Sequence, residues 1–520
     1  MKFWLKRFSK YLLYFLLIIL ILIGVGYFWP MPELASSSNS GPLLIRQINI
    51  VDVENGIILK DRDVLIKDNI IVAIDSAGVL KKEDNIQEIS GRGKFLMPGL
   101  WDMHTHSTKL SPWIHHPLYV AYGVTGIRDM SGHLGQDDSY WAGTTDRLKW
   151  NKELEDVGII RPRYLLQSSY QINGANSVPS GYLEFFKAET SDHVTKLLEH
   201  YRQEGADFVK VYSDIDSKAF LEMAEKADTY ELYLAGHKPM GLRLEQAIKA
   251  GQRSFEHGRI FMFDCYPGAT ALRESNNRAK TYVNSKIDLL TKNDTACAAN
   301  LMELMSERQT YWTPTLSTLK SAYRANDPEF VNTERLKYIP SLQRKLWWNP
   351  DISRAAAYNQ ADSTSGVNSG LYRLAQRHIL MAHERGVPIM LGTDVTDSYV
   401  FPGLTVHDEL KDLVEAGLSP LDALRSATIV SARFSEVDDI LGSVAVGKVA
   451  DLLILSANPL EDIANSNSMA GVILNGNYLD PDTLAALRAN TSDLTQSFHL
   501  NIKYAFGLFG SPLIRKQFAD

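Results

Sequence analysis

The chain has 520 residues, of which 45% are hydrophobic and 22% charged, and its formal net charge is −7. This is the composition of a globular protein that is long enough to bury a large core and to form more than one domain. The mild charge and the lack of a long basic block argue against nucleic-acid binding. The two cysteines, without a C-x-x-C motif, argue against thiolate zinc and iron–sulfur sites.

The first segment predicts a membrane anchor. Residues 1–10 form a flank with four basic residues, and residues 11–28 are 18 uncharged positions, close to the shortest helical membrane span. Cleaved signal peptides usually have shorter apolar cores, and no clear small-x-small cleavage site follows. Because basic residues mark the cytoplasmic end, we expect the body on the periplasmic or extracytoplasmic side of an inner membrane, or secreted if the leader is cleaved. That compartment would permit a disulfide between Cys265 and Cys297.

Two strand-rich pieces bracket the middle of the chain. Residues 29–44 are rich in Pro, Ser and Asn and predict a linker. Residues 45–93 then alternate apolar and polar positions between Asn-Gly and Asp-Asn turn signals, which indicates short strands and hairpins, and residues 440–480 have the same character. We expect the two pieces to form one small flanking β-sandwich domain. Residues 481–520 form a C-terminal extension to which the sequence assigns no role.

Residues 94–439 alternate short apolar runs with helical stretches, which is the pattern of β/α units around a parallel sheet. The runs predict strands at 94–106, 124–132, 163–171, 207–214, 232–239, 253–260, 310–317 and 388–395. The fold class is therefore α/β, and eight such units suit a (β/α)8 TIM barrel. Two connections, 261–309 and 318–387, are long, and we expect loops that carry binding or lid functions there.

Polar side chains stand at the ends of these predicted strands. They are His104, His106, Lys210, His237, His257 and Asp394. In a barrel the strand ends of different units meet on one face, and histidines two apart in a strand point the same way. Convergent imidazoles most often bind a metal. Each residue alone has an ordinary interpretation, as a packing histidine, a helix cap or a snorkelling lysine. Their combination at one mouth predicts a metal centre.

The order of motifs PGLWDMHTH, KVY, GHK, EHG and LGTD resembles the amidohydrolase superfamily of metal-dependent hydrolases. The strand GVTGIRD and the stretch GSVAVGKVADLLILSANPLEDI extend the resemblance over residues 45–480. It is nearest to the branch with imidazolonepropionase-like and prolidase-type proteins. It implies a small-molecule substrate with an amide or cyclic amide bond, and a dipeptide-like or N-acyl compound is favoured. A lactone or ester hydrolase with the same centre, and a metal-bound receptor or scaffold without turnover, are the alternatives.

The resemblance also implies a role for each residue of the predicted centre. His104, His106 and Asp394 would bind the more buried of two divalent metals, His237 and His257 would bind the second, and Lys210 would bridge them as a carboxylated lysine. Burial favours the neutral amine that CO₂ needs, so the assignment is chemically consistent. If Lys210 stays an ammonium, the site is mononuclear. Histidine and carboxylate ligands suit zinc, with manganese, cobalt or iron as alternatives.

The implied mechanism uses a metal-bridging hydroxide as the nucleophile. Asp394 would be the general base and then the general acid, taking a proton from the water and passing it to the leaving atom. Tyr212 shares the face of Lys210 and is a candidate for hydrogen bonding to the substrate.

Two further features have ordinary interpretations. Arg128 and Asp129 are interpreted as structural ion pairs. Trp347 and Trp348 are interpreted as lid packing, with contact to substrate or membrane as the alternative. The sequence does not predict the oligomeric state.

Overall fold

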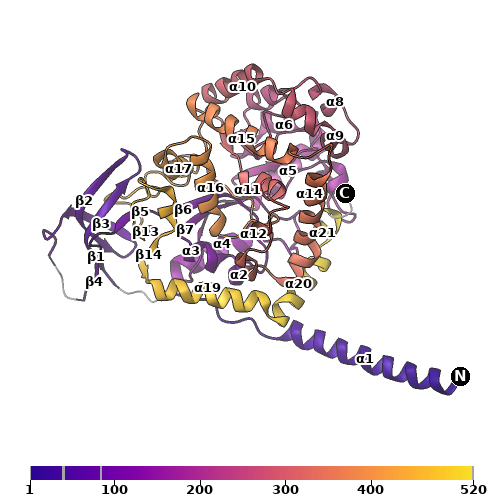
Figure 1. The fold of residues 1–520 in the computed structure, drawn as a ribbon, viewed down its shortest axis with the longest axis horizontal. Helices are drawn as coiled ribbons and strands as arrows, with labels where there is room; N and C mark the ends of the chain where they lie inside the picture. Colours follow the sequence, from indigo (N-terminus) through magenta and orange to yellow (C-terminus); the bar gives the residue numbers. More distant parts are fainter. Residues whose placement is uncertain (1, 38–40, 82–84, 518–520) are drawn as a thin grey trace.

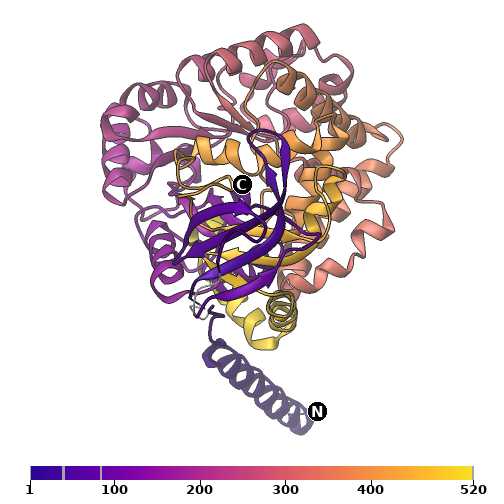
Figure 2. The same ribbon diagram turned by 90° about the vertical axis from the view of Figure 1, so that its left-hand side faces the viewer.

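The larger sheet joins segments from the two strand-rich pieces of the chain. The computed structural model describes residues 2–37, 41–81 and 85–517. Within them, the strands of this sheet in spatial order are β15 (Asn477–Leu479), β14 (Met469–Leu474), β13 (Leu452–Leu455), β5 (Phe95–Pro98), β1 (Leu43–Asp52), β2 (Ile57–Lys67) and β3 (Ile70–Ser76), with β4 (Gln87–Ser90) paired to β1. Alternate apolar residues of β1 and β13 pack into one buried cluster. Figure 2 shows this sheet in front of the surrounding helices.

The predicted strand at 94–106 is two strands. β5 pairs with β1 and β13 in the larger sheet, whereas β6 (Leu100–Thr105) pairs with β7 elsewhere. Gly99 separates them and allows a close approach, since a Cβ there would lie 2.0 Å from Thr125 Oγ1. The apolar run is continuous because both strands are buried, so its pattern does not mark the change of sheet. The expected boundary after residue 93 therefore falls just before a strand of the larger sheet.

A second series of strands is parallel. β6, β7 (Val124–Asp129) and β8 (Arg163–Leu166) form one sheet, and β9 (Phe208–Val211), β10 (Tyr233–Gly236), β11 (Ser254–Glu256) and β12 (Tyr311–Thr313) form another. Isolated parallel bridges join Ser168 to Phe208, Trp312 to Ile389 and Thr105 to Val395. The pairings thus run from β6 to β12, through the segment 389–395, and back to β6. The predicted strand at 388–395 takes part in the last two of these bridges, through Ile389 and Val395, and is not a continuous strand among the described residues.

Helices alternate with these strands, which gives the chain an α/β fold (Figure 1). They are α2 (Ser111–Ile114), α3 (His116–Ala121), α4 (Thr144–Val157), α5 (Ser191–Gln203), α6 (Ser217–Lys226), α7 (Leu244–Lys249), α8 (Ala269–Arg273), α9 (Arg278–Thr291), α10 (Thr295–Glu307), α11 (Leu316–Tyr323), α12 (Pro328–Val331), α13 (Ser341–Gln343), α14 (Asn349–Gln360), α15 (Val367–Glu384), α16 (Leu404–Glu415), α17 (Pro420–Ser426) and α18 (Ile429–Phe434).

The two long connections are helical, which corrects the expectation of loops. Residues 261–309 contain α8 to α10, and residues 318–387 contain most of α11 and all of α12 to α15. α15 shows why, because apolar side chains three and four residues apart, among them Leu371, Ala375 and Ile379, are buried on one face. Cys265, which precedes α8, forms a disulfide with Cys297 in α10.

The two terminal regions lie next to each other. α1 (Lys2–Phe28) leaves the body as a single helix (Figure 1). Its stretch Arg7–Phe28 has a mean hydropathy of 2.5 and is 6% buried, so it is long and apolar enough to cross a membrane. The C-terminal extension forms α19 (Pro481–Gln496), α20 (Phe498–Gly510) and α21 (Pro512–Gln517). α19 packs on α3, α20 contacts α1, and α21 packs on α20.

Candidate metal centre

The six predicted ligands lie in or directly after the parallel strand segments. His104 is in β6 and His106 follows it, Lys210 is in β9, His237 follows β10, His257 follows β11, and Asp394 is in the bridging segment 389–395. The barrel-like order of pairings brings these positions to one edge of the strands. All six are buried or half-buried.

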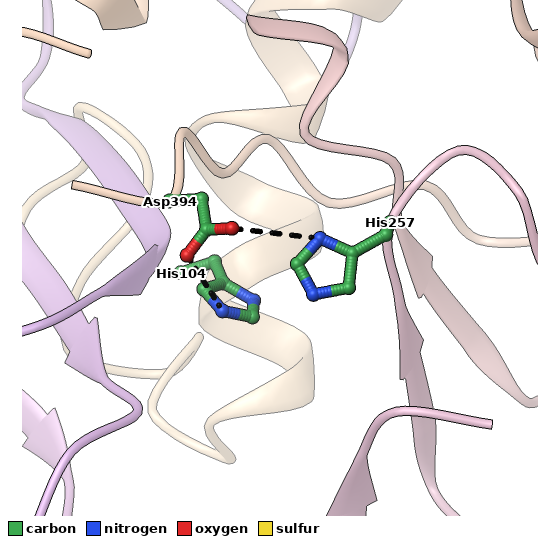
Figure 3. A group of neighbouring side chains, drawn as sticks. All are labelled: His104, His257 and Asp394. Atoms are coloured by element: carbon green, nitrogen blue, oxygen red, sulfur yellow. Dashed lines mark ion pairs between the residues drawn. The ribbon is translucent and has the colours of Figure 1, made fainter. Parts of the chain in front are cut away.

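Three of them form the tightest group. Ligand atoms of His104, His257 and Asp394 all lie within 4.8 Å of one another. His104 Nε2 is 3.3 Å from Asp394 Oδ1, and His257 Nδ1 is 3.6 Å from Asp394 Oδ2. Figure 3 shows the Asp394 carboxylate facing both imidazoles, with an ion pair marked to each. These residues come from three different strand segments, so the group exists only in the folded chain.

Asp394 also contacts the second histidine of the HTH motif. His106 Nε2 lies 3.0 Å from Asp394 Oδ1, and the backbone NH of Asp394 donates to the carbonyl of His104 at 2.8 Å. Burial alone would raise the pKa of Asp394, but the neighbouring His104 and His106 outweigh it and hold the pKa well below its usual range. Burial lowers the pKa of His106 to about 4. The site therefore holds an anionic carboxylate beside a neutral imidazole.

His237 completes the row of imidazoles. Its ring centroid is 4.5 Å from that of His257 and 4.0 Å from that of Tyr212. Burial lowers the pKa of His237 well below its usual value and lowers that of His257 to about 3. Both rings are neutral at physiological pH, which is the form that binds metals.

Lys210 is fully buried between these groups. Its Nζ donates a hydrogen bond to the carbonyl of Met130 at 2.7 Å and lies 5.6 Å from the ring of Tyr212. Burial lowers the pKa of Lys210 to about 8, although Asp394 and Glu256 oppose that shift. An appreciable fraction of the amine is therefore neutral at mildly alkaline pH.

The residues present fit a divalent metal ion. Among the described residues, His104 Nε2, His237 Nδ1 and His257 Nε2 are buried nitrogens without a hydrogen-bond partner. A buried polar atom is rarely left unpaired in a native protein unless an ion or water completes it. Several imidazoles and one carboxylate, with no thiolate, are the donor set of zinc and related ions.

Glu256 is a part of the site that the sequence analysis missed. Its Oε2 is 3.0 Å from His104 Nδ1, and its Oε1 accepts a hydrogen bond from Arg128 Nη2 at 2.8 Å, all three side chains being fully buried. The carboxylate fixes the proton on His104 Nδ1 and leaves Nε2 as the lone-pair nitrogen toward Asp394. Arg128, which was interpreted as a structural ion-pair residue, thus acts on a candidate ligand. The available signal was the spacing of Ser254 and Glu256, which share a face in β11.

A model described as the amidohydrolase family matches residues 216–479. The chain belongs to the amidohydrolase family. The matched range includes His237, His257 and Asp394 and begins after Lys210. The resemblance seen in the motifs is thereby confirmed at the level of the superfamily.

Known proteins of similar sequence and fold agree with this membership. The ochratoxinase of Aspergillus niger is 22% identical over 482 residues, covering 83% of this chain and 85% of the relative. A bottromycin amidohydrolase structure matches with a TM-score of 0.66 and 20% identity, over 87% of this chain and 90% of its own. An Xaa-Pro dipeptidase structure with bound methionine matches with a TM-score of 0.58 and 20% identity, over 85% of this chain and all of its own.

Two hollows open onto the centre of this amidohydrolase. One has a volume of about 390 Å³ and the other about 400 Å³, and both are lined by His106, Tyr212, Asp394 and Asp397. Asp397 was not predicted. Its backbone NH donates to the carbonyl of Asp394 at 2.8 Å, and burial raises its pKa to about 7.

The two hollows differ in their walls. The first includes Arg259, whose Nη1 donates to the hydroxyl of Tyr282 at 2.9 Å. The second includes Trp141, Tyr170 and Trp347, and α21 supplies Lys516 and Gln517 to it. Trp347 therefore lines a cavity, while its neighbour Trp348 is fully buried. Tyr212 stands at the junction of both hollows, and burial raises its pKa above the usual value, so its hydroxyl stays protonated.

Proposed function

We propose that this protein is a metal-dependent hydrolase that cleaves the C–N bond of an amide or cyclic amide in a small molecule. The observation that carries the proposal is the convergence of His104, His257 and Asp394, with unpartnered imidazole nitrogens, where two hollows meet. Membership of the amidohydrolase family and the similarity to a dipeptidase structure support the choice of bond.

In this proposal the ligand sets are those implied by the motifs. His104 and His106 would hold one divalent ion with Asp394, His237 and His257 would hold a second, and a carboxylated Lys210 would join them. Zinc is the metal that this donor set favours, with manganese, cobalt and iron as alternatives. When bound, such ions lower the pKa of water and polarise a carbonyl group.

The residues of the chain handle the proton and the orientation. The Asp394 carboxylate, anionic at neutral pH, takes the proton of the attacking water and returns it to the leaving nitrogen. Tyr212 keeps its hydroxyl proton and offers it to a substrate oxygen from the junction of the hollows. Glu256 holds His104 in the ligating tautomer.

The walls of the hollows support a substrate with two unlike halves. Arg259 is a permanently charged group beside His257 and Asp394, and its guanidinium donates to the hydroxyl of Tyr282. A substrate carboxylate on that side would be paired with it. The aromatic wall on the other side suits an apolar or aromatic acyl group. A dipeptide-like or N-acyl amino acid has both halves.

The test joins metal analysis to a hydrolysis screen. Purified protein is analysed for bound metals and assayed on dipeptides, N-acyl amino acids, cyclic amides and lactones, with Asp394→Asn as the inactive comparison. Bound divalent metal with amide turnover that chelation removes supports the proposal. Turnover of lactones or esters alone would show that the protein hydrolyses an ester bond and not an amide bond. Full turnover without metal, or metal without any turnover, would overturn the proposal.

We also propose an architecture and a location. The closed order of parallel pairings supports a (β/α)8 TIM barrel over residues 94–439, and the larger sheet supports a flanking β domain from residues 45–93 and 440–480, with β5 added to it. The predicted linker 29–44 ends earlier than expected, because Leu43 and Leu44 belong to β1, and its residues 38–40 lie outside the described residues. Residues 481–520, described as far as 517, would be the extension. The exposed apolar α1 supports a transmembrane anchor at 11–28, and the disulfide supports an oxidising, extracytoplasmic side for the body. Selective membrane extraction and intact mass distinguish this from a cleaved, secreted form.

A further inference from the structure

Helix α20 exposes an aromatic patch. Phe498, Phe506 and Phe509 are 57%, 48% and 60% exposed. Its opposite side is buried on the body through Leu500, Tyr504 and Leu508. A single exposed phenylalanine is ordinary, but three on one helix of 13 residues form a patch of the kind that marks a binding surface.

The patch is continuous with the end of α1. The ring of Phe506 lies 4.6 Å from that of Tyr27, and Lys503 donates a hydrogen bond to the carbonyl of Tyr27. Gly26 lets the helices approach closely, since a Cβ there would lie 2.8 Å from the ring of Phe498. Beyond this contact α1 is exposed along its apolar length. Because the apolar surface of α1 and the aromatic patch of α20 are joined in this way, we expect both to be covered by the same surroundings.

The charge of residues 494–517 indicates a membrane surface. Residues 494–517 contain Lys503, Arg515 and Lys516 and no Asp or Glu. Of these, Lys503 is in α20 and the other two are in α21. An aromatic helix without acidic residues, in a segment whose charges are all basic, fits the water interface of a membrane with anionic lipids. Tyr27, Phe28 and Trp29 at the end of the apolar stretch fit the aromatic belt of a span.

We propose that α20 is a second membrane contact, lying in the headgroup region of the bilayer beside α1. This inference rests on the proposed anchor and adds an orientation to it. α20 continues into α21, which lines the second hollow with Lys516 and Gln517 and is bonded to Tyr170 through Gln517 Nε2 at 3.0 Å. Figure 1 shows α1, α20 and α21 in succession at one end of the molecule. The segment formed by α20 and α21 would therefore connect the bilayer surface to the rim of the second hollow.

The experiment measures lipid contact at single positions of the full chain in bilayer nanodiscs that contain anionic lipid. Both native cysteines are in the disulfide, so an introduced cysteine is the labelled one. Phe506→Cys carries an environment-sensitive fluorophore, and lipids carry a quencher near the headgroups or, in a parallel sample for position 17, in the acyl chains. Val446→Cys is the matched control, at a residue that is 60% exposed and precedes Gly447, whose NH donates to the carbonyl of Ile71 in β3 of the larger sheet. Leu17→Cys in α1 reports the anchor. Hydrolysis in detergent is assayed separately.

We expect the label at position 506 to shift its emission to shorter wavelength and to be quenched by the lipid probe, while the label at 446 is unaffected. A 506 label that is unquenched while the label at 17 is quenched would overturn the proposal and leave the anchor standing. A 506 label shielded from aqueous iodide as well as from lipid would overturn it in favour of a protein partner. Unquenched labels at both 506 and 17 would overturn the anchor and the proposal together. None of these outcomes depends on the hydrolysis assay, so the proposed function is tested independently.

Discussion

Glu256 and His104, 152 residues apart in the chain, meet at 3.0 Å with both side chains fully buried. Arg128 bonds the other oxygen of the same carboxylate. The resulting row, from guanidinium to carboxylate to imidazole, fixes the direction of His104 Nε2 before any ligand arrives. The geometry of the candidate centre is thus set by two buried charges, Glu256 and Arg128, that pair with each other.

We expect Glu256→Gln to weaken metal binding about 10- to 100-fold, the usual effect of removing such a partner. The protein should also lose about 3 kcal/mol of stability, because Arg128 is left as a buried charge. Metal competition titration and urea unfolding measure the two effects. Asp63→Asn is the control, since Asp63 is a buried carboxylate paired with Arg46 in the larger sheet. If that variant lost as much metal affinity, Glu256 would have no special role in positioning His104.

Acid should destabilise the protein partly through the same carboxylate. Burial alone would raise the pKa of Glu256, but Arg128 and His104 lower it from 4.5 to about 2. A lowered folded pKa means that the stabilisation is present above pH 4.5 and is lost as the pH falls toward 2. Urea midpoints between pH 6 and pH 3 should therefore fall less steeply in Glu256→Gln than in the wild type. Parallel slopes would contradict the lowered pKa.

Asp394→Asn should reduce kcat by about 10² to 10⁴, the usual contribution of proton transfer by a positioned side chain. The pH profile of the remaining activity above pH 4 should keep its shape, because the Asp394 carboxylate is already anionic there and the amide does not titrate. Steady-state kinetics across pH, with metal content measured on the same samples, separates this effect from loss of metal. An unchanged kcat at equal metal content would remove Asp394 from the proposed mechanism.

If Lys210 is carboxylated as proposed, reactivation of metal-free protein should depend on pH. Burial lowers its pKa to about 8, and only the neutral amine reacts with CO₂. With metal added back, and bicarbonate adjusted to give the same dissolved CO₂ at each pH, recovery should therefore be about tenfold faster at pH 9 than at pH 7, in proportion to the neutral fraction. Lys210→Arg, which stays charged, should show no bicarbonate dependence. Equal recovery without CO₂ would favour the mononuclear form of the site.

Removing the disulfide should cost about 3–4 kcal/mol, the chain-entropy value for a loop of 32 residues. The double variant Cys265→Ser, Cys297→Ser should unfold at lower urea concentration than the oxidised wild type. Reductant should bring the wild type to the same midpoint and leave the variant unchanged. A wild type that is insensitive to reductant would show that the bond does not form in the purified protein.

The sequence predicted the parallel series because strand-end histidines and apolar runs are local signals, and the α/β class and the superfamily are confirmed. It did not separate β5 from β6, since both are buried and one apolar run spans them. The long connections were expected to be loops, although α15 has a regular buried face. Glu256 and the α21 wall were missed for a different reason. The role of a carboxylate in a strand, or of a basic residue in the C-terminal extension, depends on contacts with residues that are distant in the sequence.

The place of β5 in the larger sheet affects how the protein folds and unfolds. Met97 pairs with Leu453, while the same strand pairs on its other side with β1. Contacts of such large sequence separation form late and slow the search for the native topology. Removing either the larger sheet or the parallel strands with their helices would also be destabilising. It would expose a hydrophobic strand edge, which promotes aggregation. Denaturation should therefore be a single cooperative event for the larger sheet and the helices around the parallel strands.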